Sequence, residues 1–429
     1  MKSCSIRDER GVSLRRRLLL ATGIFLLSSI ASAGSFSPGL GKVLFAPDTS
    51  HHPDETAGYP RVIRLSHAES ANGTLLATFA RSGVPGETAN MPIYRSTDSG
   101  KTWSAQPIGV VRDTVHGWDI EAPALFELPA AQGDLPAGTL FAAGTAWMRK
   151  DFRQQSMEVF VSRDGGANWT YRSSCATEAL QVNNEGHGIW EPFFAITADG
   201  SLNCFFSDER PSADGFAQVI AHVRSTDGGA TWGPEIFDVA IRDGLARPGM
   251  PTVIRLRDGR YAMSFENCQA GADANHVCTV YLKTSPDGQD WTPLSALGAP
   301  IATADGKRFL HTPTIAWTPY GGSNGMLIAS GQRVVSGPEG HVTIEPESGR
   351  VLMINTELGA GPWHPIEAPM LIDPTGGYGP SETGCPGYSS PLLASNESKD
   401  PTVLMLAGTA TTNGKCDIRY GLAKLPRAH

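Results

Sequence analysis

Apolar residues along the chain gather in short stretches that come in pairs, with a turn between the two members. One pair reads PTVIRLRDGRYAMSFE from Pro251, where two apolar segments flank Asp258 and Gly259. Short apolar runs joined by an Asp-Gly or Asn-Gly turn are typical of β-hairpins. No helical periodicity accompanies them. The pattern therefore predicts an all-β protein.

The paired stretches belong to a larger unit that begins at a proline and contains about four strands. Six such units, 59 to 78 residues apart, start at Pro60, Pro123, Pro192, Pro251, Pro313 and Pro391. Six four-stranded repeats predict a six-bladed β-propeller. The tail CDIRYGLAKL would supply the third strand of the last blade. The segment GKVLFAP at 41–47 would supply its fourth strand and close the ring.

A motif of the form Ser-x-Asp-x-Gly-x-x-Trp follows the hairpin in the first four units. It reads RSTDSGKTW at 95–103, SRDGGANW at 162–169, RSTDGGATW at 224–232 and, one residue shorter, SPDGQDW at 285–291. Ser and Asp side chains bond backbone amides in tight turns, and Gly permits positive φ angles. We interpret the motif as a structural turn between the third and fourth strands, on the face opposite the chemistry. It resembles the Asp-box of sialidase-type propellers; units five and six lack it.

The first 33 residues differ from the rest of the chain. Arg15, Arg16 and Arg17 precede the apolar run LLLATGIFLL, and the segment ends at Ala31-Ser32-Ala33. This layout predicts a secretory signal peptide over 1–33, and the arginines also fit twin-arginine export. We therefore expect a secreted or periplasmic protein in which residues 34–429 form a single propeller domain.

The net charge limits which partners the protein is expected to bind. Residues 1–33 hold six of the 35 basic and two of the 43 acidic residues, so the remainder has a net charge of −12. Nucleic acid and membrane are therefore not expected as partners, and a neutral saccharide fits better. We expect a monomer.

The remaining six cysteines suggest disulfides between sequence neighbours, 268 with 278, 385 with 416 and 175 with 204, among 15 combinations. No Cys-x-x-Cys or His-x-x-x-His pair occurs, and we expect neither a metal nor a cofactor.

The propeller topology predicts where an active site would lie. Residues before each proline and after each second strand should rim one pocket, because the first strand lines the central channel. Acids, arginines, histidine and aromatics gather at these positions, a mixture that suits sugar binding. The predicted substrate-binding residues are Tyr59, Arg61, Trp118, Asp119, Trp190, Arg247, His311, Arg333 and Tyr388.

Two carboxylates on neighbouring blades stand out as catalytic candidates. Glu191 opens the first strand of unit three in HGIWEPF, and Glu266 ends the second strand of unit four in YAMSFEN. Glycoside hydrolysis uses such a pair, one as general acid and the other as nucleophile or base. The apolar neighbours of Glu191 favour the acid role, which leaves Glu266 as the nucleophile. Weaker candidates are Asp119, Glu121, Asp208 and Glu209.

Several segments resemble glycoside hydrolase family 93, the exo-α-1,5-L-arabinanases. They are GYPRVIRL, WEPFF followed by SDER, RPGMPTVIRLRDGRYAMSFE and GYSSPLL. The resemblance implies a six-bladed propeller that releases arabinobiose from the non-reducing end of linear arabinan, with retention of configuration. The family's two catalytic glutamates match Glu191 and Glu266.

Two other functions compete with this one. An exo-sialidase would use an arginine triad, here Arg61, Arg247 and Arg333, with Tyr388 or Tyr420 as nucleophile. The order of Tyr59-Pro60-Arg61 does not match the usual sialidase start motif. The other alternative is a non-catalytic propeller that binds glycans. Digestion of arabinan beside a sialyl-lactose control separates the three.

Overall fold

The structure, a computed structural model, describes residues 36–148, 154–179, 187–272, 277–372, 385–395, 401–411 and 414–426. The signal peptide predicted for 1–33 lies outside these ranges. The described residues form antiparallel strands and two single-turn helices, η1 (Glu69–Ala71) and η2 (Arg210–Asp214). Neither helix, nor any other in these ranges, has the length and apolar character needed to span a membrane.

Six sheets follow one another along the chain, each beginning near one of the six prolines. Blade one contains β2 (Thr56–Arg64), β3 (Leu75–Ser82), β4 (Met91–Ser96) and β5 (Gly109–Val111). Blade two contains β6 (Asp119–Glu127), β7 (Leu140–Trp147), β8 (Gln155–Ser162) and β9 (Thr170–Ala179). Blade three contains β10 (Ile189–Ile196), β11 (Leu202–Asp208), β12 (Val219–Ser225) and β13 (Ile236–Val239).

The other three sheets continue the same order. Blade four contains β14 (Ala246–Arg255), β15 (Tyr261–Gln269), β16 (Thr279–Ser285) and β17 (Ala299–Pro300). Blade five contains β19 (Thr314–Thr318), β20 (Met326–Ser330), β23 (Val351–Asn355) and β24 (His364–Glu367). Blade six contains β25 (Leu392–Ala394), β26 (Thr402–Ala410), β27 (Cys416–Lys424) and β1 (Lys42–Phe45).

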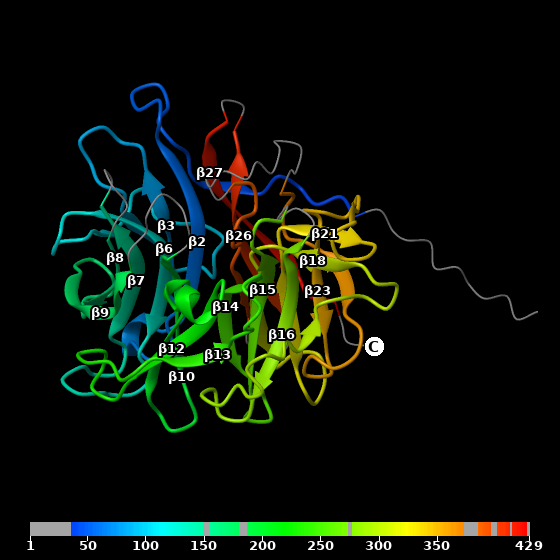
Figure 1. The fold of residues 1–429 in the computed structure, drawn as a ribbon. Helices are drawn as coiled ribbons and strands as arrows, with labels where there is room; N and C mark the ends of the chain where they lie inside the picture. Colours follow the sequence, from blue (N-terminus) through cyan, green and yellow to red (C-terminus); the bar gives the residue numbers. More distant parts are fainter. Residues whose placement is uncertain are drawn as a thin grey trace, which may run out of the picture. The chain divides into compact units, whose positions relative to one another are not determined.

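The six sheets close into a ring. Each first strand contacts the first strand of the next blade, in the order β2, β6, β10, β14, β19, β25 and back to β2. Strand β1 pairs with β27, with Lys42 opposite Tyr420, so both ends of the chain contribute to blade six. In Figure 1 the blue β2 accordingly lies beside the red β26. The predicted six-bladed propeller, with its closure by 41–47, is confirmed.

The hydrophobic core is divided into layers between neighbouring blades. Separate apolar clusters lie between blades one and two, two and three, three and four, four and five, five and six, and six and one. Both faces of a blade therefore meet apolar neighbours. This explains why many strands read as continuous apolar runs.

The four Asp-boxes form the predicted turns between third and fourth strands. In blade three the Ser225 hydroxyl donates to Asp227 Oδ1 at 2.8 Å, and the Gly229 amide donates to Ser225 Oγ at 2.8 Å. Gly228 and Gly229 have φ angles of 70° and 71°, which explains the two glycines. The boxes at Ser96, Ser162 and Ser285 show the same serine–aspartate bond. The structural interpretation of the motif is confirmed.

Blade five carries a divergent version of this turn that the sequence motif missed. Asn355 Oδ1 accepts hydrogen bonds from the amides of Glu357 at 2.8 Å and Gly359 at 2.9 Å, and Trp363 packs in the core. Asparagine thus takes over the role of the box serine and aspartate. In blade six no such turn is needed, because its third and fourth strands come from opposite ends of the chain.

Blade five also has an insertion that the repeat pattern did not predict. Strands β21 (Arg333–Ser336) and β22 (Thr343–Ile344) follow β20 but do not join its sheet. Strand β21 pairs with β18 (Arg308–Leu310) and β22 pairs with β21, which extends the sheet of blade four to β14-β15-β16-β18-β21-β22. The insertion therefore ties blade five to blade four.

Two of the three expected disulfides form, Cys268–Cys278 and Cys385–Cys416. Disulfides are consistent with an exported protein. The third pairing was wrong, since Cys175 and Cys204 are both free and buried. These two lie within strands of different blades and pack in the apolar layer between blades two and three. Burial raises the pKa of the Cys204 thiol well above its usual value, so the sulfur behaves as an apolar group.

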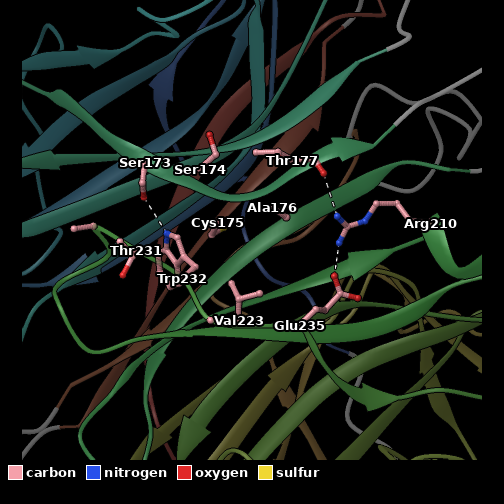
Figure 2. Close-up of a pocket in the computed structure, with 12 residues that line it drawn as sticks. Ser173, Ser174, Cys175, Ala176, Thr177, Arg210, Val223, Thr231, Trp232 and Glu235 are labelled. Carbon is pink, nitrogen blue, oxygen red and sulfur yellow. Dashed lines mark hydrogen bonds and ion pairs between the residues drawn. The ribbon is translucent and has the colours of Figure 1, made fainter.

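A cavity of about 370 Å³ lies between blades two and three. It is lined by residues of the β9 and β12–β13 region, including Cys175, Trp232 and Glu235. Figure 2 shows the Trp232 ring directed at Ser173, whose hydroxyl oxygen accepts the indole N–H at 2.9 Å. Neither Glu191 nor Glu266 lines this cavity.

Candidate active site

A repeated β-bulge begins the first strand in each of the first four blades. In blade three Trp190 pairs with Ser207 and Phe193 pairs with Phe205, so Glu191 and Pro192 together face Phe206 alone. The residue before the proline takes a positive φ, 68° for Glu191. The matching residues are Tyr59 (54°), Ala122 (51°) and Met250 (58°). A bulge changes the direction of a side chain at the end of a strand. In each of these blades the bulge places one residue at the channel rim.

Glu191 is partly buried and is held from two sides. Its Oε2 accepts a hydrogen bond from the Ser207 hydroxyl at 2.8 Å and another from the Met250 amide at 2.9 Å. Burial, and next the negative charge of Glu266, raise the pKa of Glu191 to about 7, against the two hydrogen bonds, which lower it. A carboxyl group with this pKa carries a proton in neutral solution about half of the time.

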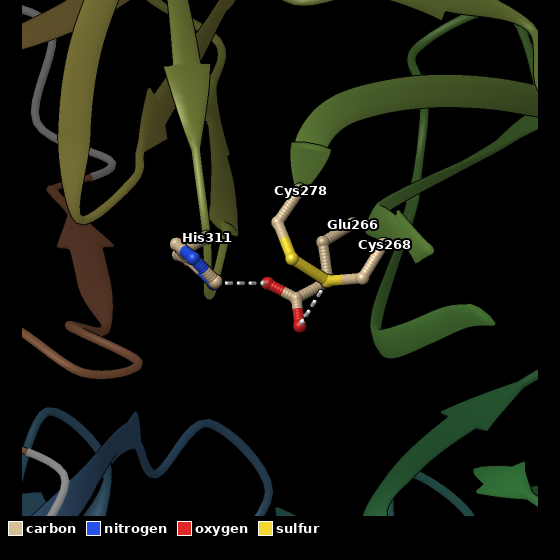
Figure 3. Close-up of side chains that lie close together, drawn as sticks. All are labelled: Glu266, Cys268, Cys278 and His311. Atoms are coloured by element: carbon tan, nitrogen blue, oxygen red, sulfur yellow. Dashed lines mark hydrogen bonds and ion pairs between the residues drawn. A yellow bond between two sulfur atoms is a disulfide. The ribbon is translucent and has the colours of Figure 1, made fainter. Parts of the chain in front are cut away.

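Glu266 lies on β15 beside a disulfide and a histidine. Its Oε2 accepts the Thr312 amide at 2.6 Å and lies 3.5 Å from His311 Nδ1. The Cys268 sulfur lies 3.6 Å from Oε1, a contact without a shared hydrogen because this sulfur is bonded to Cys278. Figure 3 shows the carboxylate between the disulfide and the imidazole ring.

One short segment at the start of β14 connects the two glutamates. Gly249 is the ladder partner of Glu266, and the next residue, Met250, donates its amide to Glu191. A Cβ on Gly249 would lie 2.5 Å from Gln218 Nε2 and 3.7 Å from Glu191 Oε2. The backbone of blade four therefore binds the Glu191 carboxylate and pairs with the backbone of Glu266.

Two tyrosines and an arginine complete the cluster. The rings of Tyr59 and Tyr388 lie 5.7 Å apart, and Arg61 Cζ lies 4.3 Å from the Tyr59 ring centre. Arg61 donates to Ser389 Oγ at 2.8 Å. Burial raises the pKa of both tyrosines, and the charge of Glu191 raises both further. The charge of Glu266 raises the pKa of Tyr388 as well.

The acidic residues of the segment SDER, residues 207–210, form ion pairs with arginines near the cluster. Arg247 forms an ion pair with Glu209 and donates to Gln218 Oε1 at 2.8 Å. Glu209 also accepts the Gly188 amide at 2.8 Å. Asp208 pairs with Arg210 at 2.8 Å. Asp208 and Glu209, the weaker catalytic candidates, thus both have arginine partners.

The structure gives the following contacts for four other predicted rim residues. Trp118 stacks on His116 with ring centres 4.3 Å apart, and Trp190 meets Trp147 edge-on at 6.1 Å. Asp119 accepts the Ala89 amide at 2.5 Å. Arg333 is 4% exposed and lies opposite Leu310 in the sheet. Their roles as substrate-binding residues stay predictions.

The sequence did not identify three groups that bond to the glutamates, namely the Ser207 hydroxyl and the amides of Met250 and Thr312. It also did not identify Gln218, which donates to the Pro248 carbonyl. Ser207 did fall in the same register as Glu266, at the end of a second strand. The amides could not be found from side-chain patterns, because any residue type supplies one. Tyr420, a candidate sialidase nucleophile, donates to the carbonyl of Lys101 in the first Asp-box, so it lies on the opposite face.

Comparisons with known proteins show a family match and several solved structures with a similar fold. Residues 41–275 match the family model of the BNR repeat-like domain. No curated protein matches the sequence. The GH93 α-L-arabinofuranosidase of Fusarium graminearum, solved with arabinobiose, shares 28% identity and a TM-score of 0.73. The α-L-arabinanase of Penicillium chrysogenum, also solved with arabinobiose, shares 28% identity and a TM-score of 0.71. Each comparison covers 90% of this chain and 98% of the other.

A sialidase of Trypanosoma rangeli, solved with the inhibitor DANA, is a more remote neighbour. It shares 12% identity and a TM-score of 0.51, over 86% of this chain and 55% of that one. At this identity the likeness concerns the fold alone. The family match covers more than half of the chain and agrees with the six blades and their Asp-boxes. The chain belongs to the BNR repeat-like domain family.

Proposed function

We propose that this protein is an exo-acting, retaining glycoside hydrolase that releases arabinobiose from the non-reducing end of α-1,5-linked arabinan. The observation that carries the proposal is the pair Glu191 and Glu266, held on adjacent blades around one segment of β14. The two similar proteins at 28% identity were both solved with arabinobiose, which supports an arabinose-containing substrate.

In the first step Glu266 attacks the anomeric carbon, and the bond from this carbon to the leaving oxygen breaks. Glu191 gives its proton to that oxygen, which leaves as a hydroxyl group. The sugar is then an ester of Glu266. In the second step Glu191 takes a proton from water, whose oxygen attacks the same carbon and frees Glu266. The raised pKa of Glu191 supports its role as acid.

The remaining groups of the cluster suit a neutral sugar. Tyr59 and Tyr388 offer two neighbouring aromatic rings, the charge of Glu191 acts on both, and His311 lies next to Glu266. We assign substrate contacts to these residues and to Arg61. The net negative charge after residue 33 and the two disulfides support an exported protein that acts on a neutral polysaccharide.

Digestion of debranched linear arabinan, with sialyl-lactose as the control substrate, tests the proposal. We expect arabinobiose as the first product from arabinan and no free sialic acid. Sialic acid release would favour the sialidase alternative. Binding of arabinan without any product would favour a glycan-binding propeller. Either result contradicts the proposed hydrolase.

A further inference from the structure

Three metal-ligating side chains meet at the junction of blades one and two, outside the proposed active site. They are Asp113 and His116, from the connection between β5 and β6, and Glu158, from β8. His116 Nδ1 lies 3.0 Å from Glu158 Oε1 and 3.6 Å from Asp113 Oδ2. One ligand atom from each residue lies within 4.8 Å of the other two.

Glu158 occupies a position on β8 where the alternation of side chains predicts an apolar residue. Its neighbours Met157 and Val159 pack between blades two and three, whereas Phe160 packs between blades one and two. Because side chains alternate along a strand, Glu158 shares the face of Phe160. Its side chain is 0% exposed, and neither carboxylate oxygen accepts a hydrogen bond. A buried carboxylate in this state is stabilised by a nearby positive charge or is neutralised by a proton.

Asp113 is fixed by its own loop with one oxygen facing Glu158. Its Oδ1 accepts the amides of Val115 and His116 at 2.8 and 3.0 Å, and its Oδ2 accepts the Trp118 amide at 2.9 Å. Its side chain is 0% exposed. Two buried acids thus share a single imidazole.

We propose that Asp113, His116 and Glu158 bind a divalent cation of the Zn²⁺ or Mn²⁺ class that ties blade one to blade two. One imidazole nitrogen and two carboxylate oxygens form a mixed ligand set of the kind these ions accept. Ligand atoms about 2.1 Å from a tetrahedral ion lie about 3.4 Å from one another, close to the measured 3.0 and 3.6 Å. The His116 side chain is 35% exposed, which gives the ion a path from solvent.

The ion would also fix the start of the first strand of blade two. His116 stacks on Trp118 with the ring planes 21° apart, and Trp118 directly precedes β6. Binding at His116 would therefore hold this aromatic pair in place. The sequence did not predict the site, because its ligands come from two separate segments. The other group of potential ligands in the described ranges, around Glu266, contains the Cys268–Cys278 disulfide, whose sulfurs are not thiolates.

The test is a metal titration of the EDTA-treated chain, without reductant, by calorimetry and metal analysis. With ZnCl₂ and MnCl₂ as separate probes, we expect one ion per chain for one or both. The melting temperature should rise by about 3 °C at a hundredfold excess over Kd. Glu158→Gln and His116→Ala should each weaken binding at least about tenfold. His116 is at the surface, so His116→Ala keeps the test valid if Glu158→Gln does not fold.

Glu235→Gln is the matched control. Glu235 is also a partly buried carboxylate, but it pairs with Arg210. This variant should bind the ion as wild type does. The competing account is a protonated His116 that bridges the two carboxylates. It predicts no stoichiometric binding and no change in melting temperature with EDTA or metal. That result, or equal binding by wild type and His116→Ala, overturns the proposal.

Discussion

The Met250 amide donates a hydrogen bond to Glu191 Oε2 at 2.9 Å, so the backbone of blade four positions a carboxylate of blade three. The residue before it, Gly249, is opposite Glu266 in the ladder between β14 and β15. The geometry of the two glutamates therefore depends on a single stretch of main chain. This stretch is where a small change should affect catalysis most.

Gly249→Ala should lower kcat about tenfold to hundredfold while the melting temperature changes little. The new methyl would lie 2.5 Å from Gln218 Nε2 and 3.2 Å from Ser207 Oγ. It would therefore displace Ser207, which donates to Glu191, and Gln218, which donates to the Pro248 carbonyl. Gly233→Ala is the control, because a Cβ there meets only the Arg224 carbonyl at 3.5 Å. Steady-state kinetics on linear arabinan should separate the two variants. Equal activity in both would contradict the positioning role.

Substitution of the two glutamates should affect different substrates differently. Glu191→Gln should lose most activity on arabinan but retain part of it on an aryl arabinoside, whose leaving group needs no proton. Glu266→Gln should lose activity on both substrates, because no covalent intermediate forms without the nucleophile. Parallel assays of the two variants give the comparison. The reverse pattern would exchange the two roles.

The pH dependence of kcat/KM should report the proton on Glu191. Activity should fall above about pH 7, where the acid loses its proton. Ser207→Ala removes a hydrogen bond that stabilises the carboxylate, so the pKa should rise. The basic limb should then move upward by about one pH unit. A limb that moves downward, or does not move, would show that another group controls it.

The same carboxyl group should make stability depend on pH. Its pKa is raised from 4.5 to about 7 in the folded protein. The folded state therefore holds a proton that the unfolded chain has lost, and this stabilisation declines as pH rises from 4.5 to 7. Glu191→Gln should gain about 2–3 kcal/mol in free energy of unfolding relative to wild type between pH 4 and 8.

Denaturant unfolding at several pH values measures this gain. Glu69→Gln is the control, because Glu69 is exposed. It should show no pH-dependent difference from wild type. If Glu191→Gln shows none either, Glu191 is ionised in the folded protein at neutral pH, and the acid role lacks its physical basis.

The propeller could be predicted from the sequence because every blade needs similar residues at equivalent positions. Each unit needs a proline-initiated first strand and a hairpin, and the Asp-box needs Ser, Asp and Gly at fixed positions. The prediction failed where another residue meets the same requirement. Asn355 forms the turn of blade five without the motif, and Cys175 and Cys204 remain thiols within a packed layer.

The site was predictable only in part. Glu191 and Glu266 could be read from blade register, because the ends of equivalent strands lie on one face. The bulge could not be predicted from the sequence. Positive φ angles are expected at glycine, but here they occur at Tyr59, Ala122, Glu191 and Met250. The contacts from Met250 and Thr312 are main-chain contacts, which side-chain patterns do not reveal.

Proton NMR of the first product released from arabinan tests the two-glutamate mechanism most directly. The spectrum is recorded before the new anomeric hydroxyl equilibrates in solution. If Glu266 forms a covalent intermediate with the sugar and Glu191 assists, the α configuration of the substrate appears first in the product. Initial appearance of the β anomer would mean a single displacement by water and would contradict the account.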